Sequence, residues 1–220
     1  MRNDTLALVG AAMLLSACGG QNAQAPDGET GDGEDAETFV KFHPQENFCV
    51  TYEQSGMLSG TSTECMRKWG TERVEIEDFV VGIGGMTQPQ KAHKIYIGDK
   101  IYNIDTDAMT GTVTTNPLYQ NLSQTDPVAL GEAMMASWGM VDSGEDKDIA
   151  GTQCNVMNSP QMGSVCLTDN LVMLEQTFMG TTKTATAVDL TSGGPDSNYS
   201  LFEQVELTEG PDVGAILETL

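Results

Sequence analysis

The side chains in this sequence with the most distinctive chemistry are its five cysteines. One of them ends an apolar run near the amino terminus, and the other four are spread over the rest of the chain: Cys18, Cys49, Cys65, Cys154 and Cys166. A cysteine thiol can accept a lipid, oxidise to a disulfide or ligate a metal ion. The spacing between the cysteines and the residues around them indicate which of these reactions to expect. The five positions therefore bear on compartment, fold and cofactor together.

Cys18 stands where a lipoprotein signal peptide would be cut. Arg2 supplies a positive start, and the apolar run Leu6–Leu15 is too short to span a bilayer. The run ends in Leu15-Ser16-Ala17-Cys18, a pattern typical of a lipobox. We therefore predict that residues 1–17 are a lipoprotein signal peptide and that the Cys18 thiol takes a diacylglyceryl group carrying palmitate-type chains. The alternatives are an ordinary signal peptide or a short membrane anchor.

Lipidation at Cys18 makes the membrane the first expected partner of this chain. Each buried CH₂ of an acyl chain contributes about 0.8 kcal/mol, and two or three chains give slow release. Residue 19 is Gly rather than Asp, and by resemblance to enterobacterial sorting rules this favours the periplasmic face of the outer membrane. The expected location is therefore the periplasm, on a lipid anchor.

The four remaining cysteines form an even set in an oxidising compartment, which predicts two disulfides. Of the three possible pairings we favour Cys49–Cys65 and Cys154–Cys166, because each would join neighbouring strands of a local hairpin. A metal site is the rival interpretation, but the sequence has no C-x-x-C motif, and both histidines are far from any cysteine. We expect no metal and no cofactor.

The sequence offers little for catalysis or for nucleic-acid binding. It has no Gly-x-Ser-x-Gly elbow, HExxH motif or phosphate-binding loop, and neither His43 nor His93 is a plausible general base. The net charge of −22 argues against binding phosphate backbones, and anionic headgroups should also repel the chain. We predict a protein that is not an enzyme and does not bind nucleic acid.

Two polar clusters have a functional and a structural interpretation. The run Asn103-x-Asp105-x-Asp107 is similar to the opening of a calcium loop, but Ala108 replaces the required glycine and Thr114 replaces the bidentate Glu. We expect a polar hairpin end there. The densest basic cluster consists of Arg67, Lys68 and Arg73, which we expect to pair with nearby acids; the alternative is a carboxylate or phosphate headgroup at a cavity mouth.

The chain divides into a tether and one domain. Residues 18–40 are acidic and poor in large apolar side chains, which predicts a lipidated disordered tether. Residues 41–220 are expected to fold as a β domain, because period-2 alternation recurs along them. The expected strands lie near residues 48–53, 61–69, 73–81, 94–97, 100–104, 153–157, 165–167, 171–178 and 182–190, with an acidic turn at 142–148.

One mid-chain helix interrupts the strands. Asp126 is its expected cap, Pro127 its first residue and Gly139 its end. Three side chains at i, i+4 and i+8 form an apolar stripe on it: Leu130, Met134 and Trp138. A second short amphipathic helix is expected over residues 212–220.

Three segments carry a resemblance to a known group of proteins: the run from Trp69 to Glu75, the hairpin from Ile95 to Tyr102, and the late stretch from Ala150-Gly-Thr-Gln-Cys154 to Ser200-Leu-Phe202. Together they resemble periplasmic half-barrel lipoproteins similar to the Lol-type lipoprotein carriers, over residues of about 45–205. The resemblance implies a mainly β (α+β) fold, an open antiparallel sheet or half-barrel curled around one mid-chain helix.

The resemblance also implies a concave apolar face that binds a hydrophobic ligand, either a lipid or an acylated protein. The candidate pocket residues are Leu130, Met134, Trp138 and Met173, since methionine thioethers suit an adaptable apolar site. The alternative is a non-catalytic structural or interaction lipoprotein of the cell envelope, whose core is filled by its own side chains and whose surface meets an envelope protein.

Overall fold

The computed structural model describes residues 40–83, 86–116, 119, 126–161 and 163–210. The chain divides after Glu37, and the described residues belong to the unit Thr38–Leu220. Cys18, nearly all of the predicted tether and the predicted helix at 212–220 lie outside the described residues. Within the described part of the chain, no helix is both long enough and apolar enough to cross a bilayer.

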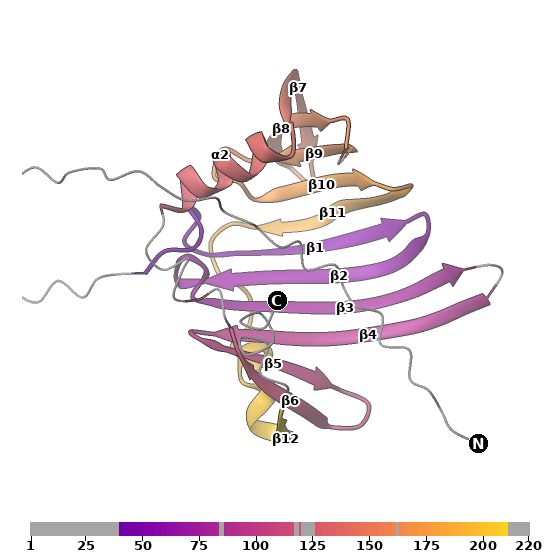
Figure 1. The fold of residues 1–220 in the computed structure, drawn as a ribbon, viewed down its shortest axis with the longest axis vertical. Coiled ribbons are helices and arrows are strands. Elements are labelled where there is room, and N and C mark those ends of the chain that lie inside the picture. The colour runs from indigo at the N-terminus through magenta and orange to yellow at the C-terminus, as the bar shows by residue number, and fades with distance from the viewer. Residues whose placement is uncertain (1–39, 84–85, 117–118, 120–125, 162, 211–220) are drawn as a thin grey trace, which may run out of the picture. The chain divides into compact units, whose positions relative to one another are not determined.

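The domain is mainly β, built on one open sheet of 12 strands (Figure 1). In sheet order, β12 is followed by β6, β5, β4, β3, β2, β1, β11, β10, β9, β8 and β7. The strands are β1 (Phe48–Ser55), β2 (Leu58–Arg67), β3 (Glu72–Ile83), β4 (Met86–Ile97), β5 (Lys100–Asp105), β6 (Thr110–Thr115), β7 (Val141–Ile149), β8 (Thr152–Ser159), β9 (Gly163–Leu167), β10 (Met173–Phe178), β11 (Thr181–Asp189) and β12 (Glu206–Glu209). All neighbours are antiparallel except β12 and β6.

Few helices accompany the sheet. The mid-chain helix α2 (Pro127–Ser137) begins as predicted, with the Asp126 carboxylate accepting a hydrogen bond from the Val128 amide at 2.9 Å. Its side chains at 130 and 134 are half-buried, and none of its residues is fully buried. Three short turns of helix were not predicted: η1 (Lys68–Gly70), α3 (Asp196–Tyr199) and η2 (Leu201–Gln204).

The alternation in the sequence sorts side chains onto the two faces of the sheet. We call one the Tyr52 face, because Phe48, Val50 and Tyr52 of β1 are buried on it. We call the other the disulfide face, because Cys49 pairs directly with Cys65 there. Successive residues of a strand point to opposite faces, and directly paired residues share a face, so the unbroken antiparallel register from β1 to β6 assigns each position of these strands to one side.

Two hydrophobic clusters form, one on each face. Around the Tyr52 face of β1, buried residues of β1, β2, β7, β8, β9, β10 and β11 pack together, and Leu174 of β10 has no exposed surface. On the disulfide face, Val74, Ile95 and Ile104 pack under Tyr199 and the half-buried Phe202. The chain after β11 therefore returns across β2–β6 and covers the part of their disulfide face around Val74, Ile95 and Ile104.

The acidic segment 142–148 is not the turn that its composition predicted. It belongs to β7, an edge strand whose register shifts between Asp142 and Asp146. The prediction was wrong because an acidic composition is equally typical of an edge strand, where exposed charges oppose pairing with another chain. The strands β6 and β12 were also missed, since their threonine-rich and short sequences carry no clear alternation.

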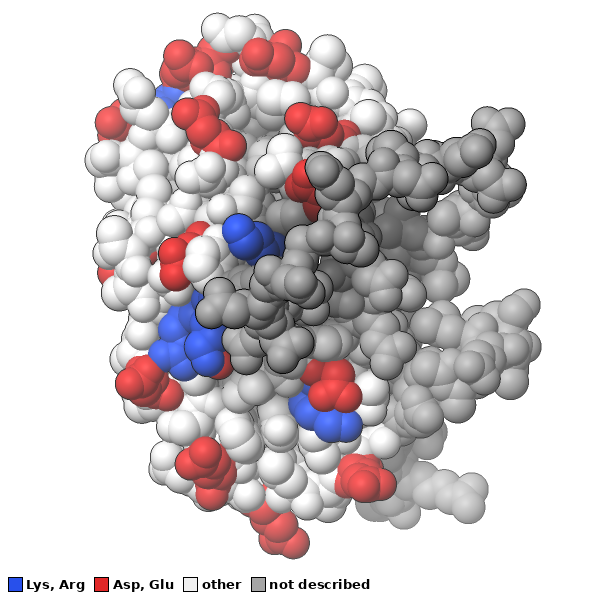
Figure 2. All heavy atoms as spheres, turned by 90° about the vertical axis from the view of Figure 1, so that its left-hand side faces the viewer, with Lys and Arg blue, Asp and Glu red and all other residues white. Residues whose placement is uncertain are grey.

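Charged side chains are unevenly distributed over the sheet ends. At the end where η1 and the start of α2 lie, acidic and basic side chains are scattered among uncharged ones over the described surface (Figure 2). Arg67 and Lys68 belong to this end, because β2 finishes at Arg67.

Candidate functional site

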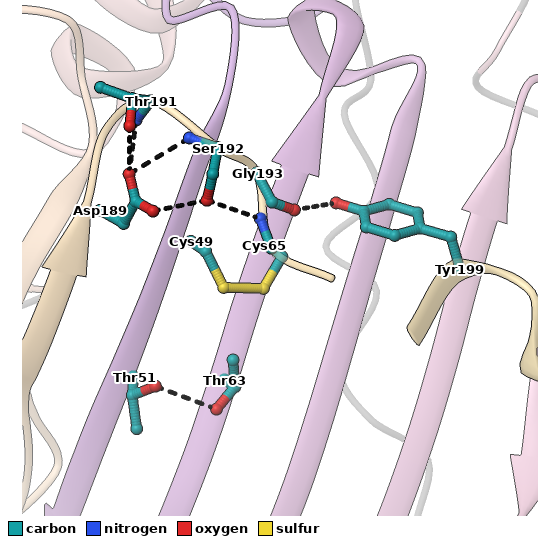
Figure 3. The surroundings of a disulfide bond; sticks show 10 residues. Cys49, Thr51, Thr63, Cys65, Asp189, Thr191, Ser192, Gly193 and Tyr199 are labelled. Carbon is teal, nitrogen blue, oxygen red and sulfur yellow. Dashed lines mark hydrogen bonds between the residues drawn. A yellow bond between two sulfur atoms is a disulfide. The ribbon is translucent and has the colours of Figure 1, made fainter. Parts of the chain in front are cut away.

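The disulfide face is built around the predicted bond between Cys49 and Cys65, which the structure contains (Figure 3). The bond links direct register partners of β1 and β2. Gly194 packs against it: a Cβ added there would lie 2.7 Å from the Cys65 sulfur, and the φ of +81° favours glycine. The chain that leaves β11 therefore packs closely against the disulfide.

Asp189 at the end of β11 directs the chain toward the disulfide. Its carboxylate accepts hydrogen bonds from the Thr191 amide at 2.8 Å and the Thr191 hydroxyl at 2.7 Å, and also from the amide and hydroxyl of Ser192 (Figure 3). These donors, with that of the Ser192 hydroxyl first, hold the pKa of Asp189 well below its usual range. Asp189 is a structural anchor that the sequence analysis did not single out, although Asp followed by Thr and Ser is a turn signal.

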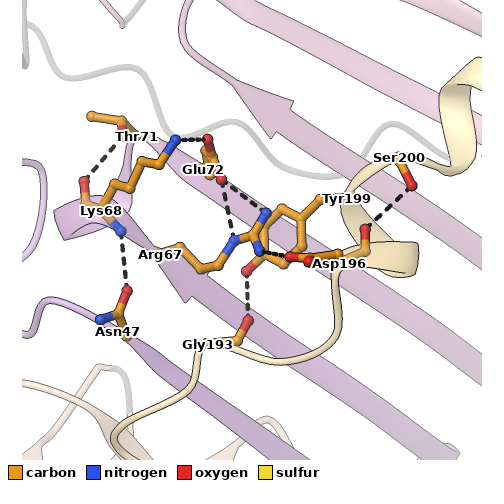
Figure 4. Close-up of polar contacts among 9 residues, drawn as sticks. All are labelled: Asn47, Arg67, Lys68, Thr71, Glu72, Gly193, Asp196, Tyr199 and Ser200. Carbon is orange, nitrogen blue, oxygen red and sulfur yellow. Dashed lines mark hydrogen bonds and ion pairs between the residues drawn. The ribbon is translucent and has the colours of Figure 1, made fainter.

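Arg67 fastens the same segment from the charged end of the sheet (Figure 4). Its guanidinium lies 3.7 Å from the ring centre of Tyr199, 3.0 Å from the Glu72 carboxylate and in contact with Asp196. The Tyr199 hydroxyl donates to the Gly193 carbonyl at 2.8 Å. This arrangement confirms the expected pairing of the basic cluster with acids, and it leaves Arg67 engaged in holding the fold.

Replacing Arg67 by methionine, which keeps an apolar stem but no charge, should lower the free energy of unfolding by about 1 kcal/mol, because two partly exposed ion pairs and a cation–π contact are lost together. The matched control is Lys100→Met. Lys100 is more exposed and lies 3.8 Å from Asp99, so its removal should change stability by less than about 0.5 kcal/mol. Urea denaturation of both variants measures the difference in their free energies of unfolding. Equal losses would contradict the role of Arg67 in fastening the segment after β11.

The Tyr52 face of β2–β4 carries an ion-pair network. Arg73 reaches Glu64 at 3.3 Å and also contacts Glu75. Glu75 in turn accepts a hydrogen bond from the Tyr96 hydroxyl at 3.3 Å and lies 4.0 Å from the Lys94 ammonium. The register places all of these side chains on one face of three neighbouring strands. This surface is polar where the half-barrel resemblance implies an apolar lining.

Lys183 of β11 extends the polar surface toward the Tyr52 core. Its ammonium lies 4.0 Å above the ring of Tyr52, whose hydroxyl donates to the Met173 carbonyl at 2.7 Å. Burial lowers the pKa of Lys183, while the charges of Glu64 and Glu77 act in the opposite direction. Burial raises the pKa of Tyr52, so this phenol stays neutral and acts as a hydrogen-bond donor. Neither Tyr52 nor Lys183 was singled out from the sequence.

Two of the hollows on the described surface can be assigned a lining, and neither contains a predicted pocket residue. One, of about 400 Å³, is lined by polar side chains and one leucine: Asp146, Thr152, Gln153, Asn155, Thr168, Asp169, Asn170 and Leu190. The other is a shallow hollow of about 550 Å³ beside the first disulfide, between β1, β11 and the Ser192–Pro195 segment. The first is lined mainly by polar groups, whereas the second exposes more apolar than polar surface but is open to solvent, unlike the enclosed site that is typical for a lipid.

Each of the predicted pocket residues lies in the described part of the fold. Met173 packs against the Tyr52 cluster, and Leu130, Met134 and Trp138 are half-buried on and after α2. The second predicted disulfide, Cys154–Cys166, is present and lies inside the same cluster. The open hydrophobic pocket stays a prediction, and Cys18 lies outside the described residues.

Both histidines are held by structural hydrogen bonds. His43 accepts a bond from the Gln45 amide at 3.0 Å through Nδ1, and Nε2 of His93 lies 3.1 Å from the Asn198 carbonyl oxygen. Burial is the main cause that lowers the pKa of each ring. The neutral form is therefore favoured in the folded protein.

This burial predicts a pH dependence of stability. Because the folded pKa of His93 lies below its unfolded value of about 6.5, the unfolded chain binds more protons as the pH falls through 6.5. The contribution of His93 to the free energy of unfolding should therefore be fully present above pH 7 and should be lost between pH 6.5 and the lowered folded pKa. Urea denaturation at pH 7.5 and 5.5 measures this fall. It should be smaller in His93→Gln, and an equal fall in that variant would contradict the assignment.

The calcium-like run is a hairpin end, as expected. The Asp105 carboxylate caps the β5–β6 turn by accepting from the Asp107 and Ala108 amides at 3.0 and 2.9 Å. Among the described residues, no group of three or more His, Cys, Asp or Glu side chains is arranged to hold a metal ion.

Comparison with known proteins does not assign the chain to a family. The chain matches no protein-family model and no curated protein. Among solved structures it is similar to an uncharacterized conserved protein from Thermus thermophilus, with a TM-score of 0.46 and 6% sequence identity over 76% of this chain and 91% of that chain. A likeness of this extent assigns no function to the present chain.

Proposed function

We propose that this chain is a lipid-anchored, non-catalytic interaction lipoprotein of the bacterial cell envelope, tethered through Cys18 at the periplasmic face of the outer membrane. Its open sheet forms a half-barrel that is filled by the protein's own side chains. Its role is to present a stable surface to a neighbour at the envelope rather than to carry a lipid inside.

The observation that carries this proposal is the occupancy of the central strands β2–β4. The part of their disulfide face around Val74 and Ile95 is covered by the returning segment with Tyr199 and Phe202. On their Tyr52 face, Glu64, Arg73 and Glu75 form a network of charges. An acyl chain laid there would strip water from these charges without replacing their interactions, which costs far more than the apolar contact returns. This supports the self-filled interpretation over the hydrophobic carrier.

The histidine and tyrosine contacts support the non-catalytic part of the proposal. His93 is bonded to a backbone carbonyl, and Tyr52 and Tyr199 each donate to one. General acid–base catalysis needs a group that can reach a substrate with its proton. These groups are instead used to hold strands and the returning segment together.

Native mass spectrometry of the protein purified from its own cells tests both parts. The expected mass is that of residues 18–220 with two disulfides and the covalent acyl groups on Cys18, with no further lipid. Labelled palmitate should enter the wild-type chain and not the Cys18→Ser variant. A stoichiometric non-covalent lipid would contradict the self-filled core and support the hydrophobic-ligand hypothesis, whereas absence of palmitate from the wild type would contradict the anchor.

A further inference from the structure

Four adjacent hairpins end in segments without a single charge, although the whole chain carries a net charge of −22. The hairpins are β8–β9, β10–β11, β1–β2 and β3–β4, which occupy consecutive places in the sheet. Their uncharged segments run over residues 149–168, 176–182, 54–63 and 79–90. The strand pairings place the described strand ends of all four hairpins at the same end of the sheet, opposite the end shown in Figure 2.

The turns of these hairpins pack directly against one another. A Cβ added to Gly56 would lie 2.1 Å from the Gly180 carbonyl oxygen, so the β1–β2 and β10–β11 turns touch through their backbones. The Gly82 amide donates to the Met57 carbonyl at 3.2 Å, which joins the β1–β2 turn to β3. A Cβ on Gly163 would lie 2.1 Å from the Thr177 carbonyl oxygen, which joins β8–β9 to β10. The four ends therefore form one continuous border.

This border exposes apolar side chains. Met179 is 72% exposed, Met57 58% and Val80 39%, while Leu58 and Phe178 beside them are half-buried. We call these five residues the apolar rim. Water-exposed apolar groups that gather in an uncharged part of a strongly acidic surface mark a place of contact with another apolar phase.

We propose that the apolar rim rests on a lipid surface, with Met57 and Met179 at the boundary between headgroups and acyl chains of the bilayer that holds the anchor. This inference rests on the proposed anchoring at Cys18. The rim is a row of hairpin turns rather than a groove, so it fits a deformable lipid surface better than the concave site of a protein partner. Its hairpin backbones are already hydrogen-bonded across the strand pairs, which lowers the cost of leaving water.

The distribution of charge favours contact of the membrane with the apolar rim rather than with the rest of the protein surface. Acidic side chains elsewhere would be repelled by anionic headgroups, whereas the rim brings no charge to the membrane.

The length of the tether also allows the apolar rim to reach the membrane. The strand β3 spans about 40 Å, and a chain of the length between Cys18 and Val40 extends to at most about 70 Å, so a tether that joins the domain near the opposite end still reaches.

The experiment uses the lipidated mature chain in vesicles of equal parts phosphatidylethanolamine and phosphatidylcholine, with bromine on the acyl chains of the phosphatidylcholine. One variant is Met179→Trp. Its matched control is Val128→Trp, because Val128 is also exposed, at 45%, but lies in the first turn of α2 away from the rim. Trp69 and Trp138 give the same background in both. We expect bromine to quench the added indole at position 179 at least threefold more than the one at position 128.

A second pair of variants tests the role of charge. In the Met179→Trp background, Met57→Asp should reduce the added quenching to less than half, because a carboxylate enters the boundary region poorly. Gln204→Asp, an added charge on the exposed surface of η2, should leave it unchanged. Vesicle flotation separates the outcomes. A chain that floats without preferential quenching at position 179 overturns the rim contact alone, whereas a chain that does not float overturns the anchoring and the contact together.

Discussion

Replacing Cys49 and Cys65 together by alanine should lower the free energy of unfolding by about 3 kcal/mol. The bond closes a loop with a sequence separation of 16, and in the chain-entropy model a loop of this size contributes about that much. The same substitution should loosen the segment that returns over the disulfide, since Gly194 packs against both sulfurs. Hydrogen exchange at residues 191–205 should therefore become faster in this variant.

The matched control is the double alanine variant of Cys154 and Cys166. Its loop has a sequence separation of 12, so the entropic loss should also be about 3 kcal/mol. The second disulfide lies in the Tyr52 cluster and does not support the returning segment. Faster exchange at residues 191–205 in both variants would show global loosening instead, and would contradict the specific role of the first bond.

The second large effect is expected at Leu174, which belongs to the Tyr52 cluster and has no exposed surface. Leu174→Ala should lower the free energy of unfolding by about 3 kcal/mol, because the transfer free energy of the removed carbons and the cavity both count. Leu130→Ala on α2 is the matched control. Leu130 is half-buried, and alanine is a better helix former, so we expect a loss below about 1 kcal/mol.

The Leu174 and Leu130 variants distinguish between two sources of the side chains that cover the sheet: its own strands and the helix α2. If strands β7–β11 supply the core, Leu174 dominates; if α2 plugs a concave face, Leu130 should cost as much as Leu174. The denaturant midpoint and the slope of the transition give the free energy of unfolding of each variant, and these two values are compared. Similar losses would contradict the self-filled core and restore the helix to the role that the half-barrel resemblance implies.

Much of the fold could be predicted from local patterns. Alternation in Phe48–Tyr52 and Arg73–Glu77 places strands because every second side chain must leave water. The cap at Asp126 and the proline after it mark the start of a helix through backbone donors that need a partner. The disulfide pairings also followed from local spacing, since each joins the two arms of one hairpin.

The sequence by itself determined the mainly β class, the start of α2 and both disulfides, because each depends on residues close together along the chain. Only the tertiary structure decided that Arg67 faces Tyr199, that Lys183 lies over Tyr52, and that four uncharged turns share one border. These contacts join residues far apart in the chain, and their geometry is set by strand order and register, which no local pattern encodes. The acidic segment 142–148 was mispredicted for the same reason. Its composition suits a turn or an edge strand, and only its pairing with β8 made it a strand.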